Sequence, residues 1–110
     1  MAIKDNRQFV EALEKTGDVV RIKQEVDWDM EAGAIGRRIN ETGAPAALCE
    51  KIKDYSDGRL LCSPLSSFRR MAVAMDMPAD STIRQIKDEY EKRIKNPIKP
   101  IIVKNAPCKE

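Results

Sequence analysis

The sequence predicts a small α/β (α+β-like) domain: a mixed sheet flanked by about four helices, in the order α-β-α-β-β-α-α, followed by an extended tail. Three observations predict it. Apolar and polar residues alternate over Val19–Val26, as in a half-buried strand. The segments on both sides of this strand carry apolar residues at helical spacing. Two short apolar runs enclose the turn residues Asp54–Gly58, which is typical of a hairpin.

The first two elements have clear boundary signals. A helix is expected from about Asn6 to Thr16, because Asp5 is a good N-cap and Gly17 is a natural residue after a helix. Its apolar face consists of Phe9, Val10 and Leu13. The strand Val19–Val26 follows directly.

A second helix is expected after Asp27–Asp29, where the two carboxylates suit a helix start, and it ends within Asn40–Gly43. Trp28 falls at helical spacing with the apolar residues of this helix. Gly33 and Gly36 each cost roughly 1 kcal/mol relative to Ala, and close packing on a sheet is the expected reason for them. The return to an apolar run makes a β-α-β crossover, which predicts that part of the sheet is parallel.

The hairpin joins Ala46–Ile52 to Arg59–Ser63. A turn centred between residues 55 and 56 places Cys49 opposite Cys62. A disulfide and two buried thiols both fit this pairing, and reduced thiols are favoured in a cytosolic chain.

Two helices complete the fold. The first spans Phe68–Met75 with a cap at Ser66–Ser67, and the second spans roughly Thr82–Lys95 with a cap at Asp80–Ser81. Residues 98–104 have strand propensity and read as a strand or a linker. We therefore expect an N-terminal α/β domain over residues 1–97, with residues 98–110 leading to a partner beyond Glu110.

Composition excludes several function classes. The net charge is +2, with −2 up to residue 83 and +4 from Arg84 onward, which is too weak for a nucleic-acid footprint. No stretch approaches the roughly 18 apolar residues of a membrane span, and the N-terminus lacks an apolar signal core. A cytoplasmic location is expected, with no nucleic-acid or membrane partner.

Histidine is absent, and the three cysteines contain no C-x-x-C pair. This argues against a zinc site and removes every Ser-His or Cys-His nucleophile pair. The chain is expected to hold no catalytic, cofactor-binding or metal-binding residue, so any chemistry it serves must be completed elsewhere.

Each polar group that resembles a site also has a structural explanation, which we favour. Asp27 and Asp29 suit acid–base chemistry or Mg²⁺, but also helix capping. Arg37-Arg38 and Arg69-Arg70 suit phosphate, but also solvated helix surfaces. The Ser63–Ser67 segment suits an anion, but also a helix cap.

Two further signals are weak. Gly33-x-x-Gly36 lacks the spacing of a dinucleotide-binding fingerprint and the strand that precedes it. Cys108 has no base nearby in sequence, so a passive thiol is expected.

Several segments together resemble the N-terminal region of the UbiD-like carboxy-lyases. The matching segments, co-linear over nearly the whole chain, are Arg7–Ile22, Val26–Ala32, the Arg37-Arg38 helix, Gly43–Leu48, Tyr55–Gly58, Ser66–Ala72 and Ala106–Glu110. The chain departs from the family pattern at Cys49, Cys62 and Leu65-Ser66.

The resemblance implies reversible decarboxylation of aromatic or α,β-unsaturated carboxylic acids on prenylated FMN, with Mn²⁺ and K⁺ at the cofactor phosphate. It places the catalytic residues, flavin contacts and metal ligands in a central domain after Glu110, so this chain alone is expected to be inactive. It also implies a homo-oligomeric parent and a flavin prenyltransferase as supplier of the cofactor. The alternative is a free-standing, non-enzymatic interaction module or small subunit that docks on a catalytic chain.

Overall fold

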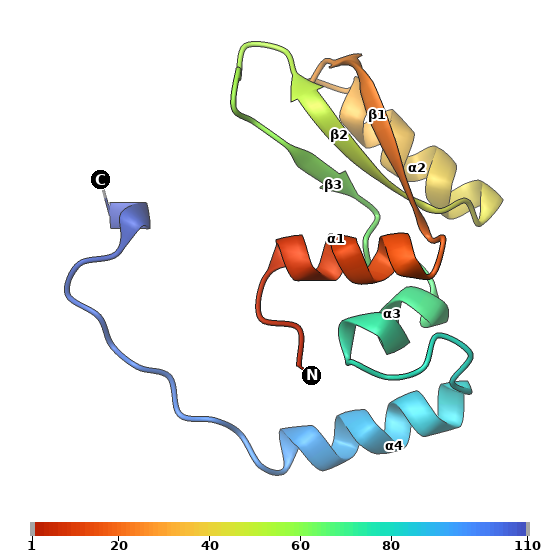
Figure 1. The fold of residues 1–110 in the computed structure, drawn as a ribbon, viewed down its shortest axis with the longest axis vertical. Coiled ribbons are helices and arrows are strands. Elements are labelled where there is room, and N and C mark those ends of the chain that lie inside the picture. The colour runs from red at the N-terminus through yellow and green to blue at the C-terminus, as the bar shows by residue number, and fades with distance from the viewer. Residues whose placement is uncertain (1, 110) are drawn as a thin grey trace.

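The computed structural model describes residues 2–109 (Figure 1). Its elements are α1 (Asn6–Lys15), β1 (Val19–Val26), α2 (Glu31–Thr42), β2 (Ala46–Ile52), β3 (Leu60–Cys62), α3 (Phe68–Ala74), α4 (Ile83–Ile94) and a short 3₁₀ turn, η1 (Pro107–Lys109). The predicted order and the α/β class are confirmed. None of the helices in the described part of the chain has the length and apolar character needed to cross a membrane.

The sheet has the order β1-β2-β3, with β2 at its centre. β1 runs parallel to β2, as the crossover predicts, and β3 runs antiparallel to β2. Pairing between β1 and β2 extends from Val19 opposite Ala46 to Val26 opposite Ile52, with a register shift between Ile22 and Glu25. The carboxyl ends of β1 and β2 therefore lie at the same edge of the sheet.

Helices cover both faces of the sheet. On one face, Ala32 and Ile39 of α2 pack on a core that includes Ala47 and Cys49 of β2. On the other face, α1 and α3 pack around Ala46, the neighbour of Ala47 on the same strand. Successive side chains of β2 point to opposite faces of the sheet, so this strand contributes residues to both cores.

The first helix follows its sequence signals closely. Asp5 accepts a hydrogen bond from the backbone N–H of Gln8 at 2.9 Å, and Gly17 adopts φ 69° after the helix. Phe9, Val10 and Leu13 are buried as predicted.

The hairpin register differs from the prediction. Cys49 pairs with Leu60, and Cys62 pairs with Ala47, so the two cysteines are diagonal rather than opposite. The turn is centred one residue earlier, because the N–H of Tyr55 bonds to the carbonyl of Ile52 at 3.2 Å and tightens the strand end. Both cysteines are buried free thiols, as favoured.

The packing expectation for the two helical glycines is half right. A Cβ at Gly33 would meet no atom within 4 Å, so close packing does not explain Gly33. A Cβ at Gly36 would lie 3.4 Å from the hydroxyl of Ser63, which donates to the Gly36 carbonyl at 3.0 Å. The close neighbour is therefore the segment after β3 rather than a strand.

Two predicted helix caps are wrong. Met30, not an aspartate, is the N-cap of α2, and its side chain makes no capping hydrogen bond. Thr82 caps α4 in a reciprocal capping box with Gln85. The cap of α3 is Ser67, one of the two serines predicted, and it accepts from Arg70 N.

α4 packs mainly on α3 and away from the sheet (Figure 1). Ile83, Ile86, Tyr90 and Ile94 follow one another at helical spacing along α4, but only Ile86 is buried, and the other three are each more than half exposed. We call these three residues the α4 stripe. Residues 97–106 form no helix or strand and run away from the body of the chain.

Candidate functional site

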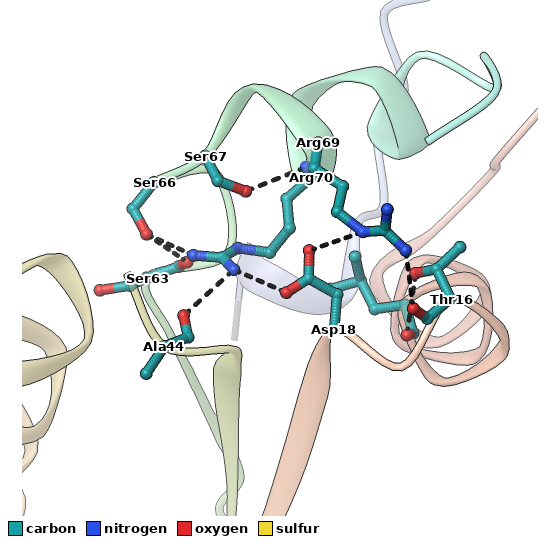
Figure 2. A network of polar contacts seen from close by, with 9 residues as sticks. Thr16, Asp18, Ala44, Ser63, Ser66, Ser67, Arg69 and Arg70 are labelled. Carbon is teal, nitrogen blue, oxygen red and sulfur yellow. Dashed lines mark hydrogen bonds and ion pairs between the residues drawn. The ribbon is translucent and has the colours of Figure 1, made fainter. Parts of the chain in front are cut away.

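Arg70 is the most deeply buried charged residue in the described part of the chain, with 2% of its surface exposed. Its guanidinium donates to Asp18 Oδ1 at 2.9 Å, to the carbonyl of Ala44 at 3.3 Å and to the hydroxyl of Ser66 at 2.6 Å (Figure 2). These partners come from the α1–β1, α2–β2 and β3–α3 connections. Arg70 therefore fastens three loops at one end of the sheet.

Arg69 completes this network from the surface. It donates to the carbonyl of Thr16 at 3.0 Å and forms an ion pair with Asp18 Oδ2 at 3.7 Å (Figure 2). Asp18 Oδ2 and Arg70 Nε are buried without a hydrogen bond in the described structure. Arg69-Arg70, which we expected to be a solvated helix surface rather than an anion site, thus forms an internal ion-pair network in which Arg70 is buried and Arg69 is half-exposed.

The serines before α3 make hydrogen bonds in the same network. Ser67 accepts from the N–H of Arg70 at 3.2 Å, and Ser66 also donates to the carbonyl of Ser63 at 3.2 Å. The predicted capping role is confirmed. The other arginine pair lies on α2, where Arg37 is exposed and bonded to Glu41 at 2.8 Å.

The side chain of Asp27 stabilises the β1–α2 loop and does not cap the following helix. Its carboxylate accepts from the N–H of Asp29 at 2.9 Å and from the ammonium of Lys53 at 2.8 Å. The hydrogen bond from Lys53 keeps the pKa of Asp27 below its usual value. The N–H of Asp27 donates to Glu31 at 2.8 Å, so the loop is closed from both sides.

Met30 adopts an uncommon backbone conformation in this loop. Its φ is 64° and its ψ is −43°, and the N–H of Glu31 donates to the carbonyl of Asp29 at 2.7 Å across it. A three-residue turn with positive φ at its centre is rare and strained for a residue other than glycine. The turn directs the chain from β1 into α2.

Three apolar side chains are exposed at this end of the sheet. Trp28 is 53% exposed, Met30 83% and Tyr55 58%. The rings of Trp28 and Tyr55 meet edge to face, with centroids 6.3 Å apart. We call these three residues the aromatic patch. Because Trp28 falls at helical spacing with the apolar residues of α2, it was grouped with that helix, and this exposed patch before the helix was missed.

The cysteines and the acidic residues form no metal cluster in the part of the chain that is described. Across residues 2–109, no group of three or more Cys, Asp or Glu side chains is placed to hold a metal ion. Burial, together with neighbouring Cys62, raises the pKa of Cys49 to about 11, so this thiol stays protonated. Cys108 is exposed.

A groove of about 950 Å³ lies between the start of α1, the sheet and the β2–β3 loop. Its charged lining residues have mixed sign, and they are Asp5, Arg7, Glu11, Arg21, Glu50, Asp57 and Arg59. Arg21 is already bonded to Glu14 and Glu50. The groove therefore shows no excess of free charge for an anionic or cationic ligand.

A smaller groove, of about 520 Å³, runs between β1 and α2. It is lined almost wholly by apolar residues, including Val20, Ile22 and Ile35.

Comparison with known proteins gives the family. The model of the family described as 3-octaprenyl-4-hydroxybenzoate carboxy-lyase N-terminal domain matches residues 10–90. The chain is 32% identical over 95 residues to a phenolic acid decarboxylase of Bacillus subtilis, which covers 84% of this chain and 20% of that protein. It is 34% identical over 115 residues to a pyrrole-2-carboxylic acid decarboxylase of Pseudomonas aeruginosa, covering 96% of this chain and 23% of that protein.

A solved structure agrees. Vanillic acid decarboxylase of Sedimentibacter hydroxybenzoicus in open form superposes with a TM-score of 0.81 at 31% identity, over 100% of this chain and 25% of that one. The chain thus spans only about a fifth to a quarter of the length of these relatives. On the family match and this structural agreement, the chain belongs to the N-terminal domain family of the UbiD carboxy-lyases.

Proposed function

We propose that this chain is the N-terminal structural domain of a UbiD-type decarboxylase. The observation that carries the proposal is the family match over residues 10–90, since the relatives named above act on phenolic, pyrrole-2-carboxylic and vanillic acids. The parent reaction is a reversible decarboxylation of aromatic or α,β-unsaturated acids on prenylated FMN. Mn²⁺ and K⁺ would hold the cofactor phosphate.

The chemistry would be completed outside residues 1–110, and these residues alone would be inactive. The support is that the polar groups singled out in the sequence are engaged in internal contacts. Arg70, Arg69 and Ser66 fasten loops, and Asp27 is bonded to Lys53. The described residues do not fit an Mn²⁺ site, because they bring together no three suitable donors. The flavin and its metals would therefore be bound by a central domain of the same polypeptide.

The α4 stripe is the surface we assign to contact with that central domain. Its three side chains share one face of α4 with Ile86, and along that face only Ile86 is buried against the rest of the chain. Exposed apolar surface of this kind is typical of a protein–protein contact. Residues 98–110 continue from this helix and would form the linker to the central domain.

The remaining partners follow from the same assignment. The parent would be a homo-oligomer in the cytoplasm and would receive its cofactor from a flavin prenyltransferase. Support for the compartment comes from Cys49 and Cys62, which are buried as free thiols.

The test compares the full-length polypeptide with the 110-residue chain. We expect flavin absorbance and decarboxylation of aromatic acids in the former and neither in the latter. Ile83→Asp/Tyr90→Asp in the full-length protein should expose the central domain to limited proteolysis. The exposed pair Arg84→Gln/Lys87→Gln makes the same change in net charge on α4 and should not. A reading frame that ends at Glu110, or flavin bound by the short chain, would contradict the proposal and favour the alternative interaction module.

A further inference from the structure

The aromatic patch lies in strongly acidic surroundings. The two segments that carry it, residues 25–31 and 50–57, contain seven acidic and two basic residues. Lys51 is paired with Glu25 at 3.8 Å and Lys53 with Asp27 at 2.8 Å, and Glu50 is bonded to Arg21 of β1. The excess negative charge is therefore carried by the other four carboxylates, Asp29, Glu31, Asp54 and Asp57. The β1–α2 and β2–β3 loops stand together at the upper end of the molecule in Figure 1, far from α4. Exposed rings and excess negative charge therefore coincide on one surface.

This combination suits one kind of ligand. Exposed Trp and Tyr rings bind proline-rich segments in an extended left-handed helix, because that conformation is already formed and loses little entropy. Lysine side chains beside the prolines gain from nearby carboxylates and from the faces of aromatic rings. A basic proline-containing segment thus matches both the rings and the charge of the patch.

The chain itself carries such a segment. Residues 95–104 read Lys-Asn-Pro-Ile-Lys-Pro-Ile-Ile-Val-Lys, with the spacing P-x-x-P, three lysines and no acidic residue. Its side chains from Ile98 to Val103 are exposed, and the segment forms no helix or strand. In Figure 1 it leaves α4 at the end of the molecule opposite to the patch.

We propose that the aromatic patch of one copy of this chain binds residues 95–104 of a second copy. Pro97 and Pro100 would hold the segment extended against Trp28 and Tyr55, and its lysines would face the carboxylates of the patch. The proposal does not depend on the decarboxylase assignment, since a segment that links two domains can also lie on a neighbouring copy. Its patch is also separate from the α4 stripe.

The chain provides its own probe, because Trp28 is its only tryptophan. The full chain is titrated with a peptide of residues 95–104 while Trp28 fluorescence is followed. We expect a saturable change that weakens at least tenfold in the variant Asp29→Lys and with a peptide in which both prolines are alanine. The control Asp80→Lys makes the same change in net charge away from the patch and should alter the affinity less than twofold.

A second measurement follows self-association of the full chain by sedimentation. Lys99→Glu and Asp29→Lys should each shift the chain toward monomer, and their combination should restore association. The proposal is overturned if no saturable change occurs up to about 1 mM peptide. It is equally overturned if a scrambled peptide binds as well, if Asp80→Lys weakens binding as much as Asp29→Lys, or if the full chain stays monomeric.

Discussion

Met30→Gly should make this chain more stable. Met30 occupies a strained positive-φ position at the start of α2, and such positions cost on the order of 1–3 kcal/mol for residues other than glycine. Glycine adopts positive φ freely but loses about 0.5–1 kcal/mol more backbone entropy on folding. Because the Met30 side chain is 83% exposed, little apolar burial is lost. The net expectation is a gain of about 1 kcal/mol in the free energy of unfolding.

The assay is urea denaturation followed by circular dichroism, with thermal unfolding as a second readout. A gain of about 1 kcal/mol raises the midpoint temperature by roughly 4–8 °C in a domain of this size. Met30→Ala is the matched control, because it removes the same side chain but keeps the cost of positive φ. If Met30→Ala stabilises as much as Met30→Gly, or if Met30→Gly is destabilising, the strained-turn argument is refuted.

Three other outcomes test the network, the thiols and the β1–α2 loop. Arg70→Met should lower the free energy of unfolding by about 3–5 kcal/mol, because the buried carboxylate of Asp18 then loses its cationic partner. The double variant Arg70→Met/Asp18→Ala should recover part of this loss, measured by urea denaturation. Iodoacetamide at pH 8 should label Cys108 of the native chain, while Cys49 reacts only after denaturation because it is buried and its pKa is raised to about 11, as peptide mass analysis would show. The pKa of Asp27 in the folded chain lies below its usual value, so the ionised carboxylate stabilises the fold above about pH 4. This stabilisation is lost as the pH falls through the folded pKa. The free energy of unfolding should therefore differ less between pH 5 and pH 3 in Asp27→Asn than in the unchanged chain.

Elements with a strong local period could be predicted from the sequence. The bounds of β1 agree with the structure because its alternation is long and a glycine turn precedes it. α1 agrees to within one residue because its cap and its closing glycine are both local signals. The family could likewise be identified, since many short matches in the correct order carry more information than any single motif.

Features that depend on contacts between distant segments could not be predicted. The register of the hairpin was wrong because the hydrogen bond from Tyr55 to Ile52 moves the turn, and composition does not report that bond. Asp27 resembled a helix cap because its partner Lys53 lies 26 residues away. The same applies to Arg70, whose partner Asp18 is 52 residues away, so a basic dipeptide looked like a surface feature.

The Arg70 network and the aromatic patch lie at opposite ends of the sheet. At the end where β1 and β2 begin, Arg70 joins three loops by buried hydrogen bonds (Figure 2). The polar side chains at that end therefore stabilise the fold. At the end where these strands finish, Asp27 and the strained Met30 hold the loop while Trp28 and Tyr55 face outward. Open α/β sheets bind their ligands at the carboxyl ends of parallel strands, and a rigid loop reduces the entropy lost on binding. The strained turn at Met30 is thus expected to keep Trp28 and Tyr55 in the position in which they meet a partner. Because Met30→Gly and Met30→Ala both remove the Met30 side chain from the patch, binding of residues 95–104 that is weaker in Met30→Gly than in Met30→Ala would show this effect of the turn separately from contact by the side chain.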